Sequence, residues 1–339
     1  MPSLSRTTRS RIVVAAKLTL GLGLIGALLW QAVRHEAFAR ISQQPKDWTL
    51  LGLALACCAV AVLISFLRWF CVARAGGVPL SVGEAGRLGA LGFALNFVSL
   101  GSVGGDLFKA VFFARRHPGL RTAAVTTIVV DRALGLLILL IMCACGVLAS
   151  GAAASQDAGV RIVAQLALGV GGVLTVAAAL AFLPALSGPL AAAALRRIPL
   201  AGELAAEALI AWRAYRKRPG WLFGASVLTV AMHSLFTVSF YLIAAGLPLK
   251  HPGVADHFVI VPLALAAGGL LPLPNGLGSV EAVVELFYRA LTGAIGDGTI
   301  VALTHRFAML LLGAAAACFY VSNRAALVVD EDDAPTKAD

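Results

Sequence analysis

Charged residues are scarce in this sequence: Asp, Glu, Lys and Arg make up 13% of 339 residues, against the roughly 25% usual in globular chains. Hydrophobic residues make up 60%, and the mean hydropathy is +0.90. The longest polar stretches, 196–219 and 324–339, are shorter than the roughly 40 residues below which a chain rarely folds alone. We therefore predict a membrane protein and expect no soluble catalytic domain within these residues. An enzyme acting alone is the least favoured function.

Clusters of metal ligands and nucleophile motifs are also missing. His, Cys, Asp and Glu are not grouped at metal-ligand spacing, and no serine lies in a nucleophile motif. The six cysteines all lie in apolar segments, which favours small core side chains over disulfides. We expect no cofactor and no metal. The net charge of +10 does not indicate nucleic acid, because the basic residues flank apolar runs instead of forming one patch.

Charge-free apolar runs set the fold class, because several reach the roughly 18 to 20 residues that cross a bilayer. They predict six full transmembrane helices at 12–33, 48–72, 122–150, 161–183, 220–246 and 299–323. Two interrupted stretches, 83–115 and 258–292, are predicted to be re-entrant hairpins, with short paired spans as the alternative. The chain is thus predicted to be an all-α polytopic membrane protein of about eight membrane segments. Its domain, 12–323, lies between a basic N-terminus (1–11) and a disordered acidic tail (324–339).

The basic residues predict the orientation. If both hairpins enter and leave on the same side, the two termini and 184–219 share one face that carries most of the 27 Lys and Arg. By the positive-inside rule that face is cytoplasmic, which places the chain in the inner (cytoplasmic) membrane. Residues 196–219 combine an apolar stripe with basic residues and predict a helix in the cytoplasmic interface. The opposite face holds Arg34, Arg40, Lys46, Arg161 and Lys250.

Both hairpins contain segments that break a helix. The first reads LGSVGGDLFK over 100–109, and the second reads LPLPNGLGSVE over 271–281. Their glycines and prolines free backbone groups that lipid cannot satisfy. Broken backbone at membrane depth is tolerated only where protein buries it or a wet cavity borders it. The two segments therefore mark candidate parts of a site.

The order of elements predicts an internal repeat, because two spans, a hairpin and one span occur twice, at about 12–157 and 158–323. Three crossings is an odd number, so the second unit is inverted relative to the first. Asp106 precedes Arg132 by 26 residues, and Glu281 precedes Arg306 by 25. Inverted repeats with broken helices are typical of alternating-access transporters, whose sites lie near the midplane. We expect Arg132 and Arg306 to be equivalent substrate gates.

Ionisable residues at membrane depth are costly, by roughly 2.5 to 3.5 kcal/mol on insertion scales, and indicate function by default. Helix capping is the alternative for Asp106 and Glu281. Arg132 needs a partner other than its neighbour Asp131, such as Asp106 or a lipid phosphate. Two structural expectations concern the other polar residues of the apolar segments: an ion pair between Glu285 and Arg289, and a hydrogen-bonded core position for His233.

Three motifs resemble a known family: Gly104-Gly105-Asp106 with Lys109, Val130-Asp131-Arg132-Ala133-Leu134-Gly135-Leu136, and Pro272-x-Pro-Asn-Gly-x-Gly-x-x-Glu281. Over roughly 12–323 the sequence is similar to the transmembrane region of lysylphosphatidylglycerol synthases and to stand-alone flippase-like proteins. The resemblance implies a lipid flippase. The soluble aminoacyl-transferring domain of the full synthases has no counterpart in these residues. The family usually has a further glycine at the position of Asn275 and an arginine at the position of Lys109.

These observations favour a flippase-like protein that moves an anionic lipid or lipid-linked headgroup between leaflets by alternating access. Its partners would be anionic phospholipid or a polyprenyl-phosphate-linked lipid. The alternatives are a secondary transporter of a small anionic solute, and a non-transporting membrane partner of a lipid-modifying enzyme or glycosyltransferase. The predicted substrate-binding or translocation residues are Gly104, Gly105, Asp106, Lys109, Asp131, Arg132, Pro274, Gly276, Gly278, Glu281 and Arg306.

The predicted topology can be tested by labelling single cysteines in intact cells. Positions 190 and 330 should be protected from an impermeant reagent, whereas positions in 34–47 and 247–257 should react, because this arrangement satisfies the positive-inside rule. Labelling of position 190 or 330 from outside would overturn the inverted repeat.

Overall fold

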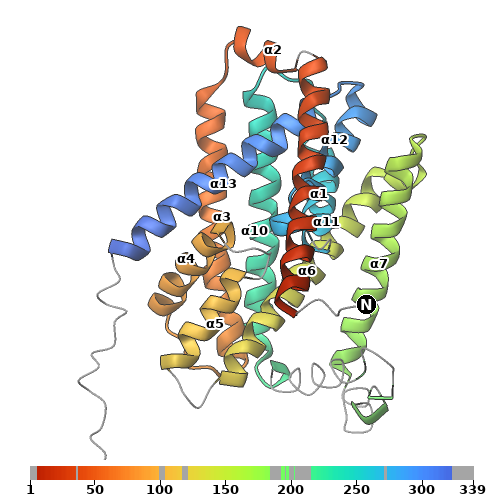
Figure 1. Ribbon diagram of the computed structural model, residues 1–339. Helices are drawn as coiled ribbons and strands as arrows, with labels where there is room; N and C mark the ends of the chain where they lie inside the picture. The colour runs from red at the N-terminus through yellow and green to blue at the C-terminus, as the bar shows by residue number, and fades with distance from the viewer. Residues whose placement is uncertain are drawn as a thin grey trace, which may run out of the picture.

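The computed structural model describes residues 6–35, 37–98, 104–116, 121–183, 215–270 and 273–322, with short pieces at 192–194, 196–197 and 202. Within these ranges the regular structure is helical throughout and contains no strand, as the sequence predicts. The helices are α1 (Arg6–Arg34), α2 (Ala37–Gln43), α3 (Trp48–Ala75), α4 (Val82–Val98), α5 (Gly104–Arg116), α6 (Arg121–Ser150), α7 (Ala158–Phe182), α10 (Pro219–Gly246), α11 (Val254–Leu270), α12 (Ser279–Thr292) and α13 (Asp297–Ser322) (Figure 1).

Helices α3 and α10 make the most extensive contact in the bundle and run in opposite directions. At one end the Asp47 amide donates to the Gly246 carbonyl at 2.9 Å. At the other end Nη1 of Arg218 donates to the Arg74 carbonyl at 2.9 Å. The Asp47 carboxylate also accepts two amide hydrogens of the first turn of α3, at 2.9 and 3.1 Å, which fixes where that helix begins.

Two pairs of shorter helices fold back on themselves. Helices α4 and α5 have 17 and 13 residues, and α11 and α12 have 17 and 14. At about 1.5 Å per residue even the longer ones reach only about 25 Å, less than the roughly 30 Å of a hydrocarbon core. In Figure 1 α4 and α5 lie in the lower half of the bundle, whereas α12 lies toward its upper end.

Each helix pair packs against the long helix that follows the other pair: α4 contacts α13, and α11 contacts α6. A glycine makes room at each crossing. A Cβ on Gly313 of α13 would lie 2.7 Å from the ring of Phe97 on α4. A Cβ on Gly146 of α6 would lie 2.8 Å from the carbonyl oxygen of Phe258 on α11. The two crossings therefore require the same small residue at the same kind of contact.

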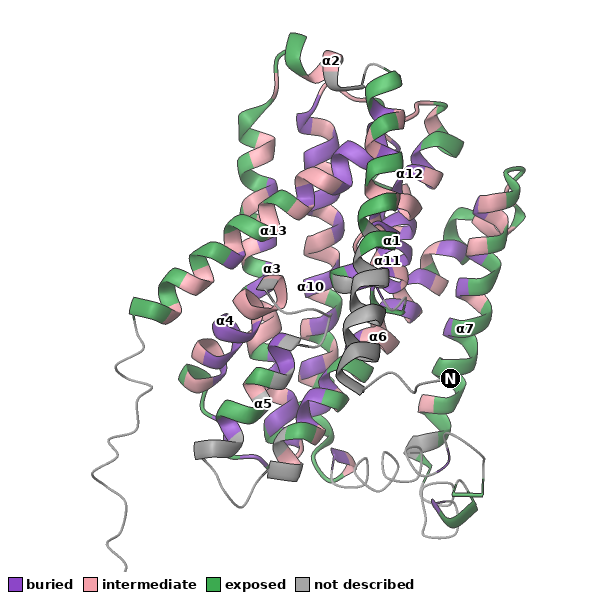
Figure 2. Ribbon diagram, in the orientation of Figure 1, coloured by how far each residue is buried: buried purple, intermediate pink, exposed green. Residues whose placement is uncertain are grey.

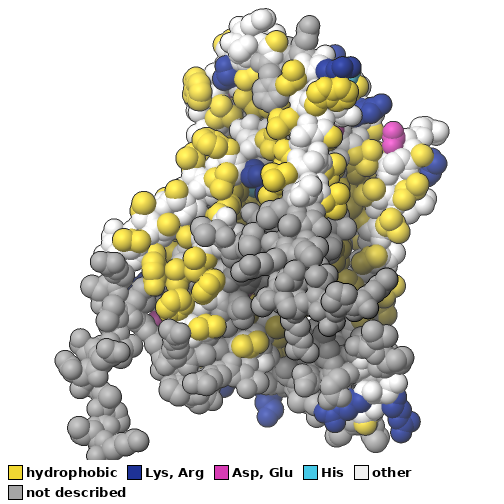
Figure 3. All heavy atoms as spheres, viewed as in Figure 1, with side chains coloured by type: hydrophobic (Ala, Val, Ile, Leu, Met, Phe, Trp, Pro, Cys, Tyr) yellow, Lys and Arg dark blue, Asp and Glu magenta, His cyan; other side chains and the backbone are white. Residues whose placement is uncertain are grey.

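Apolar side chains cover the flank of the bundle, and the Lys and Arg visible in Figure 3 lie mostly near its two ends. Leu63 on α3, Val173 on α7 and Phe307 on α13 are 59%, 69% and 61% exposed. The outward faces of α7 and α13 are exposed along most of their length, while the buried residues gather around α10 and α11 (Figure 2). Such an apolar exterior needs lipid around it, and the chain is a multi-pass integral membrane protein.

Five helices are long and apolar enough to cross a membrane, and they match five of the six predicted spans: Trp48–Ala75, Val125–Ser150, Ala158–Leu180, Pro219–Gly246 and Asp297–Ser322. The sixth predicted span, 12–33, falls within α1, of which Leu22–Arg34 is a shorter apolar helix. Its full crossing remains a prediction. The predicted interfacial helix at 196–219, apart from short pieces, and the predicted acidic tail lie outside the described residues.

Close packing at the start of α5 generates a stability prediction. A Cβ on Gly105 would overlap the carbonyl oxygen of Gly92 on α4, so Gly105→Ala must push the two helices apart. We expect a loss of about 1 to 3 kcal/mol, visible as a lower melting temperature of the purified protein. Gly172→Ala on α7 is the matched control, because nothing lies within 4 Å of the methyl group that this substitution adds. Equal melting temperatures for both variants would contradict the close contact.

Candidate functional site

Both predicted breaks place an acid in the first turn of the helix that follows. Asp106 is the third residue of α5, and Glu281 is the third residue of α12. The two residues are buried, with 3% and 0% of their surface exposed. Backbone amides at a helix N-terminus favour a carboxylate. In an apolar bundle, a cation beside such a carboxylate further lowers the free energy of burying its charge.

At the first break Asp106 binds two cations. The Nζ atom of Lys109 lies 2.5 Å from its Oδ1, and its Oδ2 accepts hydrogen bonds from Nε and Nη2 of Arg132. The Gly105 amide donates to Oδ1 of Asn96 at 3.1 Å, which ties α4 to the start of α5. The sequence allowed either Asp106 or a lipid phosphate as the partner of Arg132. The structure pairs Arg132 with Asp106.

At the second break Arg306 is the one cation among the described residues that pairs with Glu281. Its Nε donates to Oε1 of the acid at 2.5 Å. The other carboxylate oxygen, Oε2, accepts the Gly278 amide at 2.9 Å. The remaining guanidinium nitrogens donate to the carbonyls of Asn275 and Gly276 at 3.2 and 3.3 Å. Arg306 thus holds both the acid and the turn before it.

The backbone conformation of the second turn accounts for the residue types found there. Asn275, Gly276 and Gly278 have φ angles of 49°, 62° and 83°, in the left-handed region that glycine enters without steric cost and asparagine tolerates. Pro274 begins the 3-10 turn Pro274–Gly276. Gly104 begins α5. The segments 99–103 and 271–272, which complete the two breaks, lie outside the described residues.

Asp131 belongs to a separate ion pair, although it is adjacent to Arg132 on α6. Its Oδ2 lies 2.8 Å from Nη2 of Arg68 on α3, and the two residues are 6% and 8% exposed. The guanidinium lies over Gly135, where an added Cβ would meet it. The predicted site is therefore divided, because Asp131 neutralises a cation on α3 and not one of the hairpin cations.

Three residues that position Lys109 and the first turn were missed by sequence reasoning. The aliphatic stem of Lys109 lies against Gly92, and its ammonium is 5.2 Å from the ring centre of Trp69. Asn96 accepts the Gly105 amide. None of these residues belongs to a motif, and their contacts depend on how α3, α4 and α5 pack. The general tendency of Lys to lie over a Trp ring is the one signal in the sequence that points to the contact between Lys109 and Trp69.

The predicted ion pair between Glu285 and Arg289 is wrong. Both oxygens of Glu285 accept hydrogen bonds from the start of α13: the Gly296 amide at 2.6 Å, and the amide and hydroxyl of Thr299 at 2.9 and 3.1 Å. Arg289 is exposed. The first amides of a helix have no partner within that helix, and α13 begins inside the protein. The buried carboxylate of Glu285 supplies the acceptor that these amides need, and so it does not pair with the exposed Arg289.

The expected hydrogen bond of His233 is also absent from the described residues. Its ring lies near the Gly135 carbonyl, but neither ring nitrogen has a partner in hydrogen-bonding geometry. A different histidine, which the sequence did not single out, is satisfied. His257 is fully buried, with Nδ1 2.8 Å from the Gly253 carbonyl and Nε2 2.7 Å from the Tyr288 hydroxyl. It joins α11 to α12.

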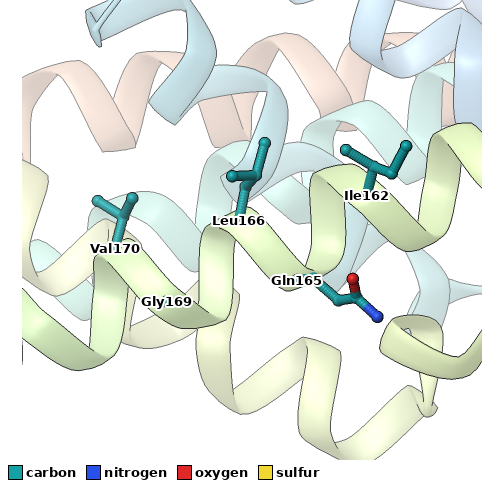
Figure 4. Close-up of a pocket in the computed structure, with 5 residues that line it drawn as sticks. All are labelled: Ile162, Gln165, Leu166, Gly169 and Val170. Atoms are coloured by element: carbon teal, nitrogen blue, oxygen red, sulfur yellow. The ribbon is translucent and has the colours of Figure 1, made fainter.

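A hollow of about 370 Å³ on α7 lies apart from these charges. Its lining is Ile162, Gln165, Leu166, Gly169 and Val170, all on one helix (Figure 4). The lining contains no charged side chain and none of the predicted site residues. Among the described residues no group of three or more His, Cys, Asp or Glu could hold a metal ion. The charged hairpin turns are therefore the candidate site.

Comparison with known proteins agrees with the motifs. Residues 14–317 match the family described as the lysylphosphatidylglycerol synthase TM region. The matched range contains every candidate site residue. No curated protein matches the chain.

The pair formed by Arg68 and Asp131 generates a stability prediction. Arg68→Met strands a buried carboxylate and Asp131→Leu strands a buried guanidinium, so each single variant should lose about 3 to 5 kcal/mol. The double variant should recover most of that loss, because an apolar pair of similar volume is tolerated. Melting temperatures of the three purified variants measure this coupling. Additive losses in the double variant would contradict a buried pair.

Proposed function

Because the chain belongs to the lysylphosphatidylglycerol synthase TM region family, we propose that it is a flippase-like membrane protein that moves an anionic lipid, or a lipid-linked headgroup, between leaflets by alternating access. The family name links the chain to lipid handling. The chain would act in the cytoplasmic membrane with both termini in the cytoplasm, and as a transporter without catalysing a reaction. Its cargo would be an anionic phospholipid or a polyprenyl-phosphate-linked lipid.

The observation that carries the proposal is the pair of arginines held by acids at two broken hairpins. A headgroup that crosses hydrocarbon must exchange its water for protein partners, because a bare charge in lipid is prohibitively costly. A guanidinium binds phosphate through two parallel hydrogen bonds. Asp106 pairs with Arg132 and Glu281 pairs with Arg306, so both guanidinium groups have a counterion within the bundle.

An inverted repeat would give the two hairpins opposite access, and the packing supports it. The repeat pairs α3 with α10, α4 with α11 and α6 with α13. The antiparallel contact of α3 with α10, and the crossed contacts of α4 with α13 and α11 with α6, are those that a two-fold axis between the halves requires. Re-entrant hairpins agree with the short helices α4, α5, α11 and α12. Rocking of one half against the other would then alternate access.

Exposure of Arg132 favours a lipid cargo over a small solute. Its side chain is 49% exposed, although it lies on a helix with an apolar exterior. A cargo with acyl chains needs a polar group that is reachable from the side, whereas a solute needs a closed central cavity. The apolar hollow on α7 is not such a cavity, since it has no charged lining.

Reconstitution into liposomes tests the function. Purified protein should move labelled phosphatidylglycerol or polyprenyl phosphate to the other leaflet, and move labelled phosphatidylcholine more slowly because it carries no net charge. Arg289→Gln is the control for variants that remove Arg132 or Arg306, because Arg289 is exposed and lies outside the two acid–arginine pairs. It should transport as well as the unaltered protein.

The alternatives give different results in the same liposomes. Uptake of labelled phosphate or sulfate without lipid movement would contradict the flippase and support a solute transporter. Movement of neither, together with co-purification of a lipid-modifying enzyme or glycosyltransferase, would support a non-transporting partner.

A further inference from the structure

The two hairpin turns have the same plan but unequal charge. Asp106 is shared by Lys109 and Arg132, so the first turn carries one cation more than it has acids. Glu281 is paired with Arg306 alone within the described residues, so the second turn is neutral. A surplus cation attracts an anion, whereas a neutral pair has no charge to offer unless it first breaks.

Lys109 is held at Asp106 independently of Arg132. Its stem occupies the space that Gly92 leaves open, and its ammonium lies 5.2 Å from the ring centre of Trp69. Only 12% of its side chain is exposed, against 49% for Arg132. When Arg132 turns away, Lys109 remains as counterion, so Asp106 is not left alone in the membrane interior.

Arg306, unlike Arg132, cannot leave its acid without breaking further contacts. Besides the bond to Glu281, it donates to the carbonyls of Asn275 and Gly276. Its side chain is 19% exposed. Its departure would leave a fully buried carboxylate without a cation and free two carbonyls of a left-handed turn. The equal spacing of the acids and arginines therefore does not make the two arginines equal in chemistry.

We propose that Arg132 is the cation that leaves its acid to bind the lipid phosphate, and that Lys109 is a positioning residue that keeps Asp106 neutralised meanwhile, whereas Arg306 stays fixed as a structural cation. This inference rests on the proposed function and assigns the phosphate to the first hairpin. The ligand is a phosphate mono- or diester of a lipid headgroup, which a guanidinium binds through two hydrogen bonds.

Four variants separate the roles when transport of labelled phosphatidylglycerol and melting temperature are measured on the same preparations. Arg132→Gln should lose transport by about tenfold or more and keep its melting temperature, because Lys109 still neutralises Asp106. Lys109→Gln should also lose transport with little change in melting temperature, because Arg132 becomes the sole counterion and cannot leave. Lys109→Arg should restore transport. Arg306→Gln should lower the melting temperature by several degrees, because it strands Glu281.

The double variant Lys109→Gln with Arg132→Gln is the matched control, because it strands Asp106 and should be destabilised as Arg306→Gln is. Normal transport by Lys109→Gln, or its loss in step with melting temperature, would overturn the role of Lys109. Equal melting temperatures for Arg132→Gln and Arg306→Gln would overturn the unequal turns. If the unaltered protein moves no lipid, the proposed function fails, while the melting temperatures still decide the charge assignment.

Discussion

Asp106 and Glu281 are buried carboxylates at broken helices, each with a cation beside it, and the central part of this structure depends on those ion pairs. An unpaired charge in hydrocarbon is costly, and a cation beside the carboxylate lowers that cost. Both acids lie at breaks where helix N-termini favour acids. Glu281 depends on Arg306 of α13 for its cation, whereas Asp106 has Lys109 of its own helix besides Arg132 of α6. The two arginine pairs join each hairpin to the helix that follows it.

Glycine supplies the space that these pairs need. Gly105 lets α5 begin against α4, and Gly135 leaves room for the guanidinium of Arg68. Gly146 and Gly313 allow each hairpin to pack on the long helix that follows the other hairpin. Small residues at helix contacts are the usual means of close approach in membranes, where burial of apolar surface gives helices no preference for one another over lipid. Polar pairs and small residues therefore act together in holding the bundle.

Much of the fold and part of the site could be predicted from the sequence, because membrane thickness and charge cost act locally. Charge-free runs predicted six spans, and five of them match helices long enough to cross a membrane. The similar separations of Asp106 from Arg132 and of Glu281 from Arg306 singled out four residues that the structure pairs, although the partner of Arg132 was left open. The partner of Asp131 could not be predicted, because Arg68 lies 63 residues away on a helix whose facing side depends on tertiary packing. Glu285 was assigned to Arg289 by helical spacing, but the free amides of α13 bind it instead.

The most direct test of the ion-pair requirement is the melting temperature of Arg306→Gln compared with that of the double variant Glu281→Gln with Arg306→Gln. The single variant leaves a buried carboxylate without a cation. The double variant replaces that carboxylate by a neutral amide that can still accept the Gly278 amide hydrogen. If neutralising the acid is what Arg306 does for the fold, the double variant should regain most of the lost melting temperature. A double variant that melts at or below the single variant would contradict the account.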